Sequence, residues 1–158
     1  MASSGAADRA REPWAVRLHN GAARVLLTVW IGSLWTIGYV VAPALFATLD
    51  DRSLAGSIAG NLFHIETRIS VVCGVLLLAL LWAGKGSREA TTRCAWLVAL
   101  MLALVVVSEW VVGPVLAEAV RGTREFAALH GVSALLYLAT SLLGLALLLS
   151  WRPVSTAA

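Results

Sequence analysis

The stretch VLLTVWIGSLWTIGYVVAPALFATL, residues 25–49, contains no charged residue. A helix rises about 1.5 Å per residue, so roughly 20 apolar residues cross the ~30 Å hydrocarbon core of a bilayer. The stretch is therefore long enough to cross a membrane once. It is too long for the apolar region of a typical signal peptide, and no small-residue cleavage site follows it before Asp50, so we expect it to be retained.

Three further apolar runs follow along the chain. The second run lies at residues 69–83 and is extended outward by the mildly apolar residues 54–65. The third and fourth runs lie at residues 94–120 and 127–151. Only short polar segments separate the runs, and short connections make consecutive helices antiparallel neighbours. The sequence therefore predicts an all-α fold, a four-helix transmembrane bundle of up-down topology, with helices at about 25–49, 54–84, 94–120 and 127–151.

The composition of the 158-residue chain also indicates a protein surrounded by lipid. Hydrophobic residues make up 59% and charged residues 13%, whereas soluble domains have about 25% charged residues. These values exclude a soluble domain and a disordered chain. Two cysteines, Cys73 and Cys94, cannot form a disulfide framework. The arginines are scattered rather than gathered into a patch with aromatic residues, so the expected partner is the lipid bilayer and not nucleic acid.

The basic residues predict how the bundle is oriented. The N-terminal segment, the loop between the second and third helices and the C-terminus together carry eight Lys or Arg residues, and the opposite side carries four. Cytoplasmic loops carry the excess of such residues, so we expect both termini in the cytoplasm. One lysine against eleven arginines, with heavy use of alanine and leucine, points to a GC-rich bacterial genome and hence to the bacterial inner (cytoplasmic) membrane.

The two ends of the chain are predicted to lie outside the membrane domain, which spans residues 25–151. We expect residues 1–24 to form a cytoplasmic tail with a short interfacial segment at 13–24. Residues 152–158 are expected to be a disordered C-terminal tail.

Glu109 is the one ionisable residue that the sequence places clearly inside a membrane helix. Such a residue costs ~2.5–3.5 kcal/mol at the helix centre on insertion scales and indicates function. Counting along the predicted helices puts Tyr39 and Tyr137 at about the same depth, so we expect Glu109 to face the bundle interior near one or both tyrosines. His130 and Ser133 lie on the same helical face as Tyr137 and complete a predicted intramembrane polar cluster.

Two interpretations of this cluster stay open. Its members either supply hydrogen bonds between helices, at ~0.6 kcal/mol per contact, or line a path for a ligand or an ion. Glu109 is either a neutral hydrogen-bonding group, or an ionised one in a water-filled vestibule with Arg68 or Arg124 as its counter-charge.

Small residues and prolines mark the predicted packing surfaces. Gly56 and Gly60 are four residues apart, a spacing that lets two helix backbones approach closely, and Gly32 lies on the small and polar face of the first helix. Pro43 and Pro114 each lie near the outer end of a helix and free a backbone carbonyl there. These surfaces predict packing against a second copy of the chain or another membrane protein, although an alanine-rich chain also meets such spacings by chance.

The two proline segments resemble each other. Residues 39–45 (YVVAPAL) and 110–116 (WVVGPVL) share four of seven positions. Each is followed by a loop and then by an apolar residue next to a histidine, Phe63-His64 and Leu129-His130. The pattern fits duplication of a two-helix unit, or chance in so apolar a chain.

Four segments resemble a known protein family. They are WIGSLW at 30–35, VAPALF at 41–46, the small-residue stretch at 55–63 and FAALHGVS at 126–133. Together they resemble the domain of unknown function 4149 family, whose vertebrate relatives are called transmembrane protein 205-like, over about residues 25–150. The resemblance implies a four-helix membrane protein with no established activity, and the family's histidine maps to His130.

A fainter resemblance is to small membrane proteins of copper resistance and haem synthesis, which also have a Trp-x-Gly helix ending in proline. Histidines near helix ends can bind haem there, so this resemblance implies haem held by His130, with His64 as a second axial ligand. The chain has no nucleotide-binding loop, nucleophile elbow, zinc-protease or paired-carboxylate motif. We therefore expect a non-enzymatic protein without a cofactor that packs with a partner or handles a small solute, with a haem-binding redox protein as the alternative.

Overall fold

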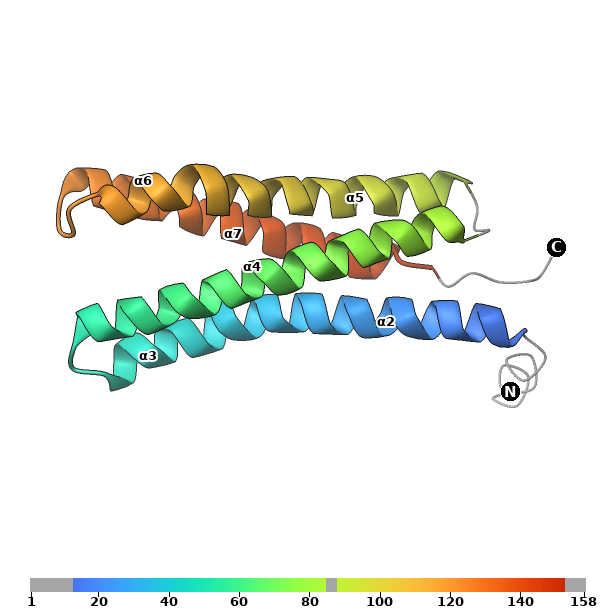
Figure 1. Cartoon of the computed structure of the whole chain (residues 1–158), viewed down its shortest axis with the longest axis horizontal. Coiled ribbons are helices and arrows are strands. Elements are labelled where there is room, and N and C mark those ends of the chain that lie inside the picture. Colours follow the sequence, from blue (N-terminus) through green and yellow to red (C-terminus); the bar gives the residue numbers. More distant parts are fainter. Residues whose placement is uncertain (1–12, 85–87, 153–158) are drawn as a thin grey trace.

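The computed structural model describes residues 13–84 and 88–152. Within these ranges the chain is helical and contains no strand. The helices form four spans that lie side by side (Figure 1), and each span is long and apolar enough to cross a membrane. The predicted all-α fold with four membrane-spanning helices is confirmed.

The first and third spans are each built from two α-helices joined by a π-helical segment, whereas the second and fourth are single α-helices. The first span consists of α2 (Trp14–Trp35), η1 (Thr36–Val41) and α3 (Ala42–Thr48). The third consists of α5 (Arg88–Val107), η2 (Ser108–Val112) and α6 (Gly113–Glu118). The second and fourth spans are α4 (Arg52–Ala83) and α7 (Arg124–Ser150).

The helices extend beyond the apolar runs from which they were predicted. The first begins at Trp14 rather than at residue 25, so the segment expected to lie separately in the interface continues α2. The second, third and fourth begin at Arg52, Arg88 and Arg124, ahead of the predicted residues 54, 94 and 127. Helical hydrogen bonds form within the chain in water as well as in lipid, so an apolar run marks only the lipid-covered part of a helix. The tails predicted at 1–12 and 153–158 lie outside the described residues.

Side chains cap the two helices that start at the end of the bundle opposite the chain termini. The carboxylate of Asp51 accepts hydrogen bonds from the backbone N–H groups two and three residues ahead, at 2.8 and 3.1 Å. The hydroxyl of Thr123 accepts one from the N–H of Phe126 at 3.2 Å. These bonds satisfy donors that the first helical turn leaves free, and they explain why α4 and α7 begin where they do.

Each π segment lies directly before a proline. The residue before Pro43 donates its N–H to the carbonyl of Ile37, and the residue before Pro114 donates to that of Ser108, in both cases five residues back. Proline has no N–H and its ring crowds the carbonyl four residues back, which a wider turn relieves. The two sequence-similar segments therefore share one local structure.

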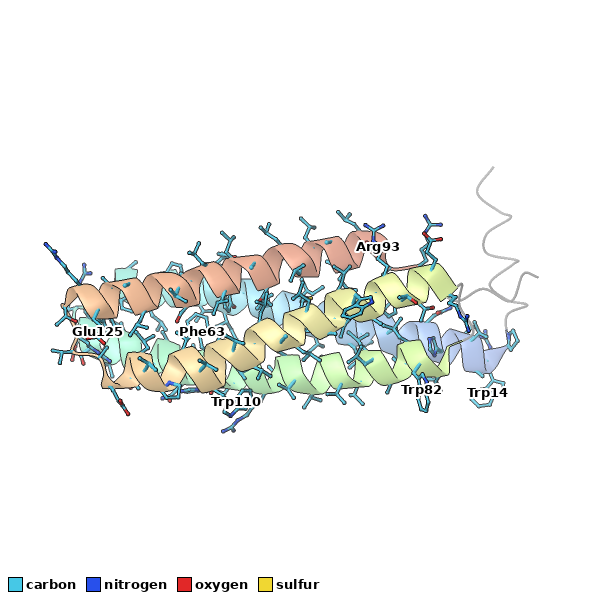
Figure 2. The ribbon with its side chains drawn as sticks, turned by 90° about the horizontal axis from the view of Figure 1, so that it is seen from above. Trp14, Phe63, Trp82, Arg93, Trp110 and Glu125 are labelled. Carbon is cyan, nitrogen blue, oxygen red and sulfur yellow. The ribbon has the colours of Figure 1, made fainter. Side chains whose placement is uncertain are left out.

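The spans run up and down, and the start of α2, the end of α4 and the end of α7 lie at one end of the bundle (Figure 1). We call this the termini end, and the end with the α3–α4 and α6–α7 connections the far end. Trp14 and Trp82 mark the termini end in Figure 2, and Glu125 marks the far end. Trp14 is 72% and Trp82 is 93% exposed, as expected for tryptophans at a membrane interface.

The tightly packed core lies in the half of the bundle nearer the termini end. It contains buried side chains from all four spans, among them Trp30, Leu77, Val98, Met101 and Leu147. At the far end, η1, α3, η2 and α6 bury no residue. The bundle is thus closely packed toward the termini end and more open toward the far end, where the candidate site lies.

Candidate functional site

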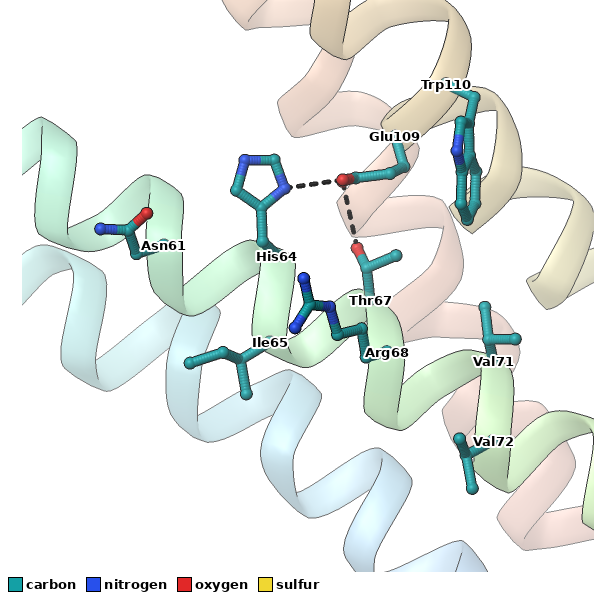
Figure 3. Close-up of a pocket in the computed structure, with 9 residues that line it drawn as sticks. All are labelled: Asn61, His64, Ile65, Thr67, Arg68, Val71, Val72, Glu109 and Trp110. Carbon is teal, nitrogen blue, oxygen red and sulfur yellow. Dashed lines mark hydrogen bonds and ion pairs between the residues drawn. The ribbon is translucent and has the colours of Figure 1, made fainter.

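Glu109 lies inside η2 and contacts α4. Its Oε1 is 2.6 Å from Nδ1 of His64, and its Oε2 accepts a hydrogen bond from the hydroxyl of Thr67 at 3.4 Å (Figure 3). In the part of the chain that the structure describes, no hydrogen bond joins Glu109 to Tyr39 or Tyr137. The structure therefore pairs Glu109 with a histidine and a threonine from one face of α4 rather than with a tyrosine.

His64 and Glu109 line a groove between α4 and η2 with a volume of ≈ 850 Å³. The His64 side chain is 60% exposed and that of Glu109 is 25% exposed, so the pair is open to its surroundings. The other lining residues mix polar and apolar side chains: Asn61, Ile65, Thr67, Arg68, Val71, Val72 and Trp110. The groove therefore opens sideways from the bundle, toward the bilayer.

Arg68 supplies a cation to this groove. It lies near the middle of α4, roughly 22 Å along the helix from Ala83, and it is exposed. Among the described residues, no carboxylate oxygen lies within 4.0 Å of its guanidinium. An arginine inside the membrane is costly unless another group satisfies it, and the described part of the chain gives Arg68 no ion-pair partner.

A second carboxylate, Glu66, lies inside the bundle and is only 3% exposed. It accepts a hydrogen bond from the hydroxyl of Ser70 at 2.6 Å, and Ser70 accepts one from the indole N–H of Trp30 at 2.6 Å. These bonds join the first and second spans through a buried polar chain. Buried polar groups of this kind are costly unless they are paired, so the chain fixes how the two helices pack.

The depth of Glu66 does not follow from the apolar run at residues 69–83, which begins three residues after it. A signal was nevertheless present. Glu66, Ser70, Cys73 and Gly74 recur at i, i+4, i+7 and i+8, which places them on one helical face. All four are buried in the structure, so this face of small and polar residues is the one that turns inward.

Tyr39 and Tyr137 form a separate cluster between η1 and α7. Their ring centroids are 6.1 Å apart in an edge-on contact, and Phe63 meets Tyr137 in a second one at 5.3 Å. The hydroxyl of Tyr137 donates a hydrogen bond to the backbone carbonyl of Leu34, and its ring lies against Gly38. In an α-helix the carbonyl of Leu34 would accept from the N–H of residue 38, so the tyrosine supplies a donor to a carbonyl at the start of the π segment.

Within the described chain, the tightest contacts of glycines are with side chains and occur at Gly38 and Gly74, whereas the predicted packing of Gly32, Gly56 and Gly60 against a partner stays a prediction. A Cβ added at Gly32 or Gly60 would have no neighbour within 4 Å, and one at Gly56 would make only ordinary contacts. A Cβ at Gly74 would lie 2.6 Å from a leucine, and one at Gly38 would overlap the ring of Tyr137. The glycines that the internal packing requires are therefore Gly38 and Gly74.

His130 and Ser133 lie apart from the Glu109 pair. His130 is exposed near the start of α7, with its ring stacked on Phe126 at a centroid distance of 6.1 Å. Neither residue hydrogen-bonds to Glu109 within residues 13–84 and 88–152. Nor does any group of three or more His, Cys, Asp or Glu in these ranges come together to hold a metal ion. Among the described residues, Glu109 thus bonds to His64 and Thr67 and to no member of the predicted cluster.

Residues 25–125 match the model of a protein family described as "Domain of unknown function (DUF4149)". The matched region contains the first span from residue 25 onward, the whole second and third spans, and the whole groove between α4 and η2. The comparisons with curated proteins and with solved structures gave no match.

Proposed function

The chain belongs to the domain of unknown function 4149 family, and from this premise we propose a non-enzymatic, multi-pass protein of the bacterial inner membrane that binds a small solute in the groove between α4 and η2. Both termini lie in the cytoplasm in this proposal. The observation that carries it is the His64–Glu109 pair, 2.6 Å apart and partly exposed within two membrane spans. Ionisable groups in such positions mark substrate or ion pathways.

The groups around the pair suit polar recognition. Thr67 holds Oε2 of Glu109, and Oε1 fixes the ring of His64 through Nδ1. The Nε2 atom of that ring is then free to bond a solute, and the side-chain amide of Asn61 offers both donors and an acceptor. A solute entering from the side would meet these groups without passing through the packed core.

A role in packing alone accounts less well for the groove. Helices that associate through small residues need no ionisable pair, because close backbone contact already supplies the attraction. The open space around Gly60 leaves room for a second copy of the chain or another membrane protein beside α4. Such a partner is compatible with solute binding but does not explain His64 and Glu109.

The test is native mass spectrometry of the protein extracted from its own membrane in a mild neutral detergent. We expect a small molecule to remain bound to the unmodified protein and to the control variant Glu118→Gln, which changes an exposed carboxylate outside the groove. Glu109→Gln is expected to lose the molecule while keeping its helical circular dichroism spectrum. An empty unmodified protein, or equal retention by both variants, would contradict the proposal.

Haem binding is the second candidate function, favoured by the contact between Glu109 and Nδ1 of His64. A carboxylate on one ring nitrogen orients a histidine so that the other nitrogen can bind a metal, an arrangement common around metal-ligating histidines. His130 would be the other axial ligand of a redox-active haem. Protein from haem-replete cells should then show a Soret band that His130→Ala removes or shifts. An absent band, or one that this variant leaves unchanged, rules the candidate out.

A further inference from the structure

The ionisable residues that line the groove are His64, Arg68 and Glu109. His64 and Glu109 contact each other directly, so the carboxylate of Glu109 is engaged by His64 and not by Arg68. The guanidinium of Arg68 has no carboxylate partner among the described residues. The groove therefore presents a guanidinium without an ion-pair partner, which favours an anionic ligand.

The depth of Arg68 places this charge near the headgroups of one leaflet. Trp82 marks the interface at the termini end, and Arg68 lies roughly 22 Å from Ala83 in a hydrocarbon core of ~30 Å. About 8 Å of the core then remains above Arg68, a distance that a long arginine side chain largely covers by extending outward. The guanidinium can thus meet a headgroup in the leaflet at the far end of the bundle.

Apart from Asn61 and Thr67, the rest of the groove is apolar, and it is open to the side. Val72 is 58% and Trp110 is 60% exposed, and both line the groove together with Ile65 and Val71. Its volume of ≈ 850 Å³ lies in the range of sites for small organic molecules, well beyond the size of a single inorganic ion. An acyl chain can lie against this surface while its headgroup reaches the polar residues.

We infer that the groove binds a bilayer amphiphile with an anionic headgroup, a phosphate or a carboxylate, through Arg68. The planar guanidinium donates two parallel hydrogen bonds to the headgroup oxygens, a geometry that suits both groups. Asn61 adds an amide donor, and the apolar residues hold the chain. This inference rests on the proposed function, since it names the chemical class of the solute in the same groove.

The experiment measures binding to the full-length protein in neutral detergent by native mass spectrometry. The probes are phosphatidylglycerol, oleate, phosphatidylcholine and inorganic phosphate. Phosphatidylglycerol or oleate should bind about tenfold more tightly than zwitterionic phosphatidylcholine, and Arg68→Gln should remove that preference. The matched control is Arg124→Gln, which removes an exposed arginine outside the groove and should leave the preference within about twofold of the unmodified protein.

Three results would overturn the inference. The first is equal binding of phosphatidylcholine and the anionic lipids, and the second is an unchanged preference in Arg68→Gln. The third is competition by inorganic phosphate at the same concentration as the lipids, which would indicate a site for free anions. Arg68→Lys keeps the positive charge but loses the planar guanidinium that donates two parallel hydrogen bonds. Partial retention of the preference for anionic lipids by this variant supports pairing with the headgroup and shows that the site is intact.

The two proposals fail in different ways. A co-purified molecule that is lost in Glu109→Gln but is neutral or cationic leaves the solute-binding function standing and contradicts the anionic headgroup. An unmodified protein that carries no molecule from its own membrane and shows no preference among the added lipids contradicts both.

Discussion

The hydroxyl of Tyr137 occupies the place where the first span would otherwise close an α-helical turn. It donates a hydrogen bond to the carbonyl of Leu34, which in an α-helix would accept from the N–H of Gly38, four residues ahead. The ring fits there because residue 38 has no Cβ. The absence of a side chain at Gly38 thus lets Tyr137 of the fourth span pack against the π segment of the first span.

Gly38→Ala should destabilise the protein by about 1–3 kcal/mol, the usual cost of forcing extra volume into a packed site. The new methyl group would overlap the ring of Tyr137, so either the ring or the helix must move. The free energy of unfolding in mixed detergent micelles measures the effect. Gly32→Ala is the matched control, because its Cβ meets open space and alanine favours the helix by up to about 1 kcal/mol. Equal stability of the two variants would show that Tyr137 does not lie against Gly38.

Ser70→Ala should also be destabilising, for a different reason. The serine accepts from Trp30 and donates to Glu66, so its loss leaves two buried polar groups unpaired, at about 1–3 kcal/mol each. Ser141→Ala provides the comparison, because its buried hydroxyl has no hydrogen-bond partner among the described residues and its removal should cost little. Unfolding of the two variants under the same conditions tests the difference. A larger loss in Ser141→Ala would contradict the buried chain of hydrogen bonds.

At the scale of elements, the π segments change which residues share a helical face. A helical wheel drawn through the first span puts Thr36, Tyr39 and Pro43 on one stripe, but the wide turn of η1 rotates everything beyond it. Glu109 lies inside η2, the equivalent wide turn of the third span, and contacts α4. This is why the depth of Glu109 was predictable from its position in an apolar run while its partners were not.

The four spans themselves were predictable because crossing a bilayer requires long apolar helices, and apolar runs of that length seldom have another structural role. Helix starts were less predictable, since Trp14 and Arg52 begin helices in polar flanks where no apolar pattern marks them. The contact of His64 with Glu109 joins residues 45 positions apart and depends on how two helices meet. A single sequence holds no direct signal for such a contact.

Pro114→Ala is expected to return η2 to α-helical geometry, because alanine supplies the missing N–H and does not crowd the preceding turn. Glu109 would then rotate away from His64. The chain has three histidines, so the ring nitrogens of ¹⁵N-histidine-labelled protein can be resolved individually by NMR in detergent. The signals of His64 should change while those of His19 and His130 stay in place.

Pro43→Ala alters the equivalent turn of the first span and serves as the control for that experiment. It should leave the His64 signals nearly unchanged, because His64 bonds to η2 and not to η1. If both proline variants shifted the His64 signals equally, the local role of Pro114 would be wrong.

At the scale of the whole molecule, the bundle has two chemically different ends. The proposed orientation, with both termini in the cytoplasm, predicts the outcome of reporter fusions. A reporter that is active only in the periplasm should be active when fused after Gly122, and inactive when fused after Gly86, because the excess of basic residues lies on the side of the termini. The opposite pattern of activity would reverse the orientation and place the headgroup site in the other leaflet.

The uneven packing along the bundle also makes its open half sensitive to small rotations between two hairpins, one formed by the first and second spans and the other by the third and fourth. Leu77 belongs to the packed core, and His64 lies on the same helix roughly 20 Å away, in the open half. At that distance from the packed core, a rotation of about 5° of one hairpin against the other displaces His64 by about 2 Å. Such a displacement breaks a contact of 2.6 Å between His64 and Glu109 while hardly disturbing Leu77. The contact between His64 and Glu109 is therefore more sensitive to the angle between the two hairpins than the packed half of the bundle is.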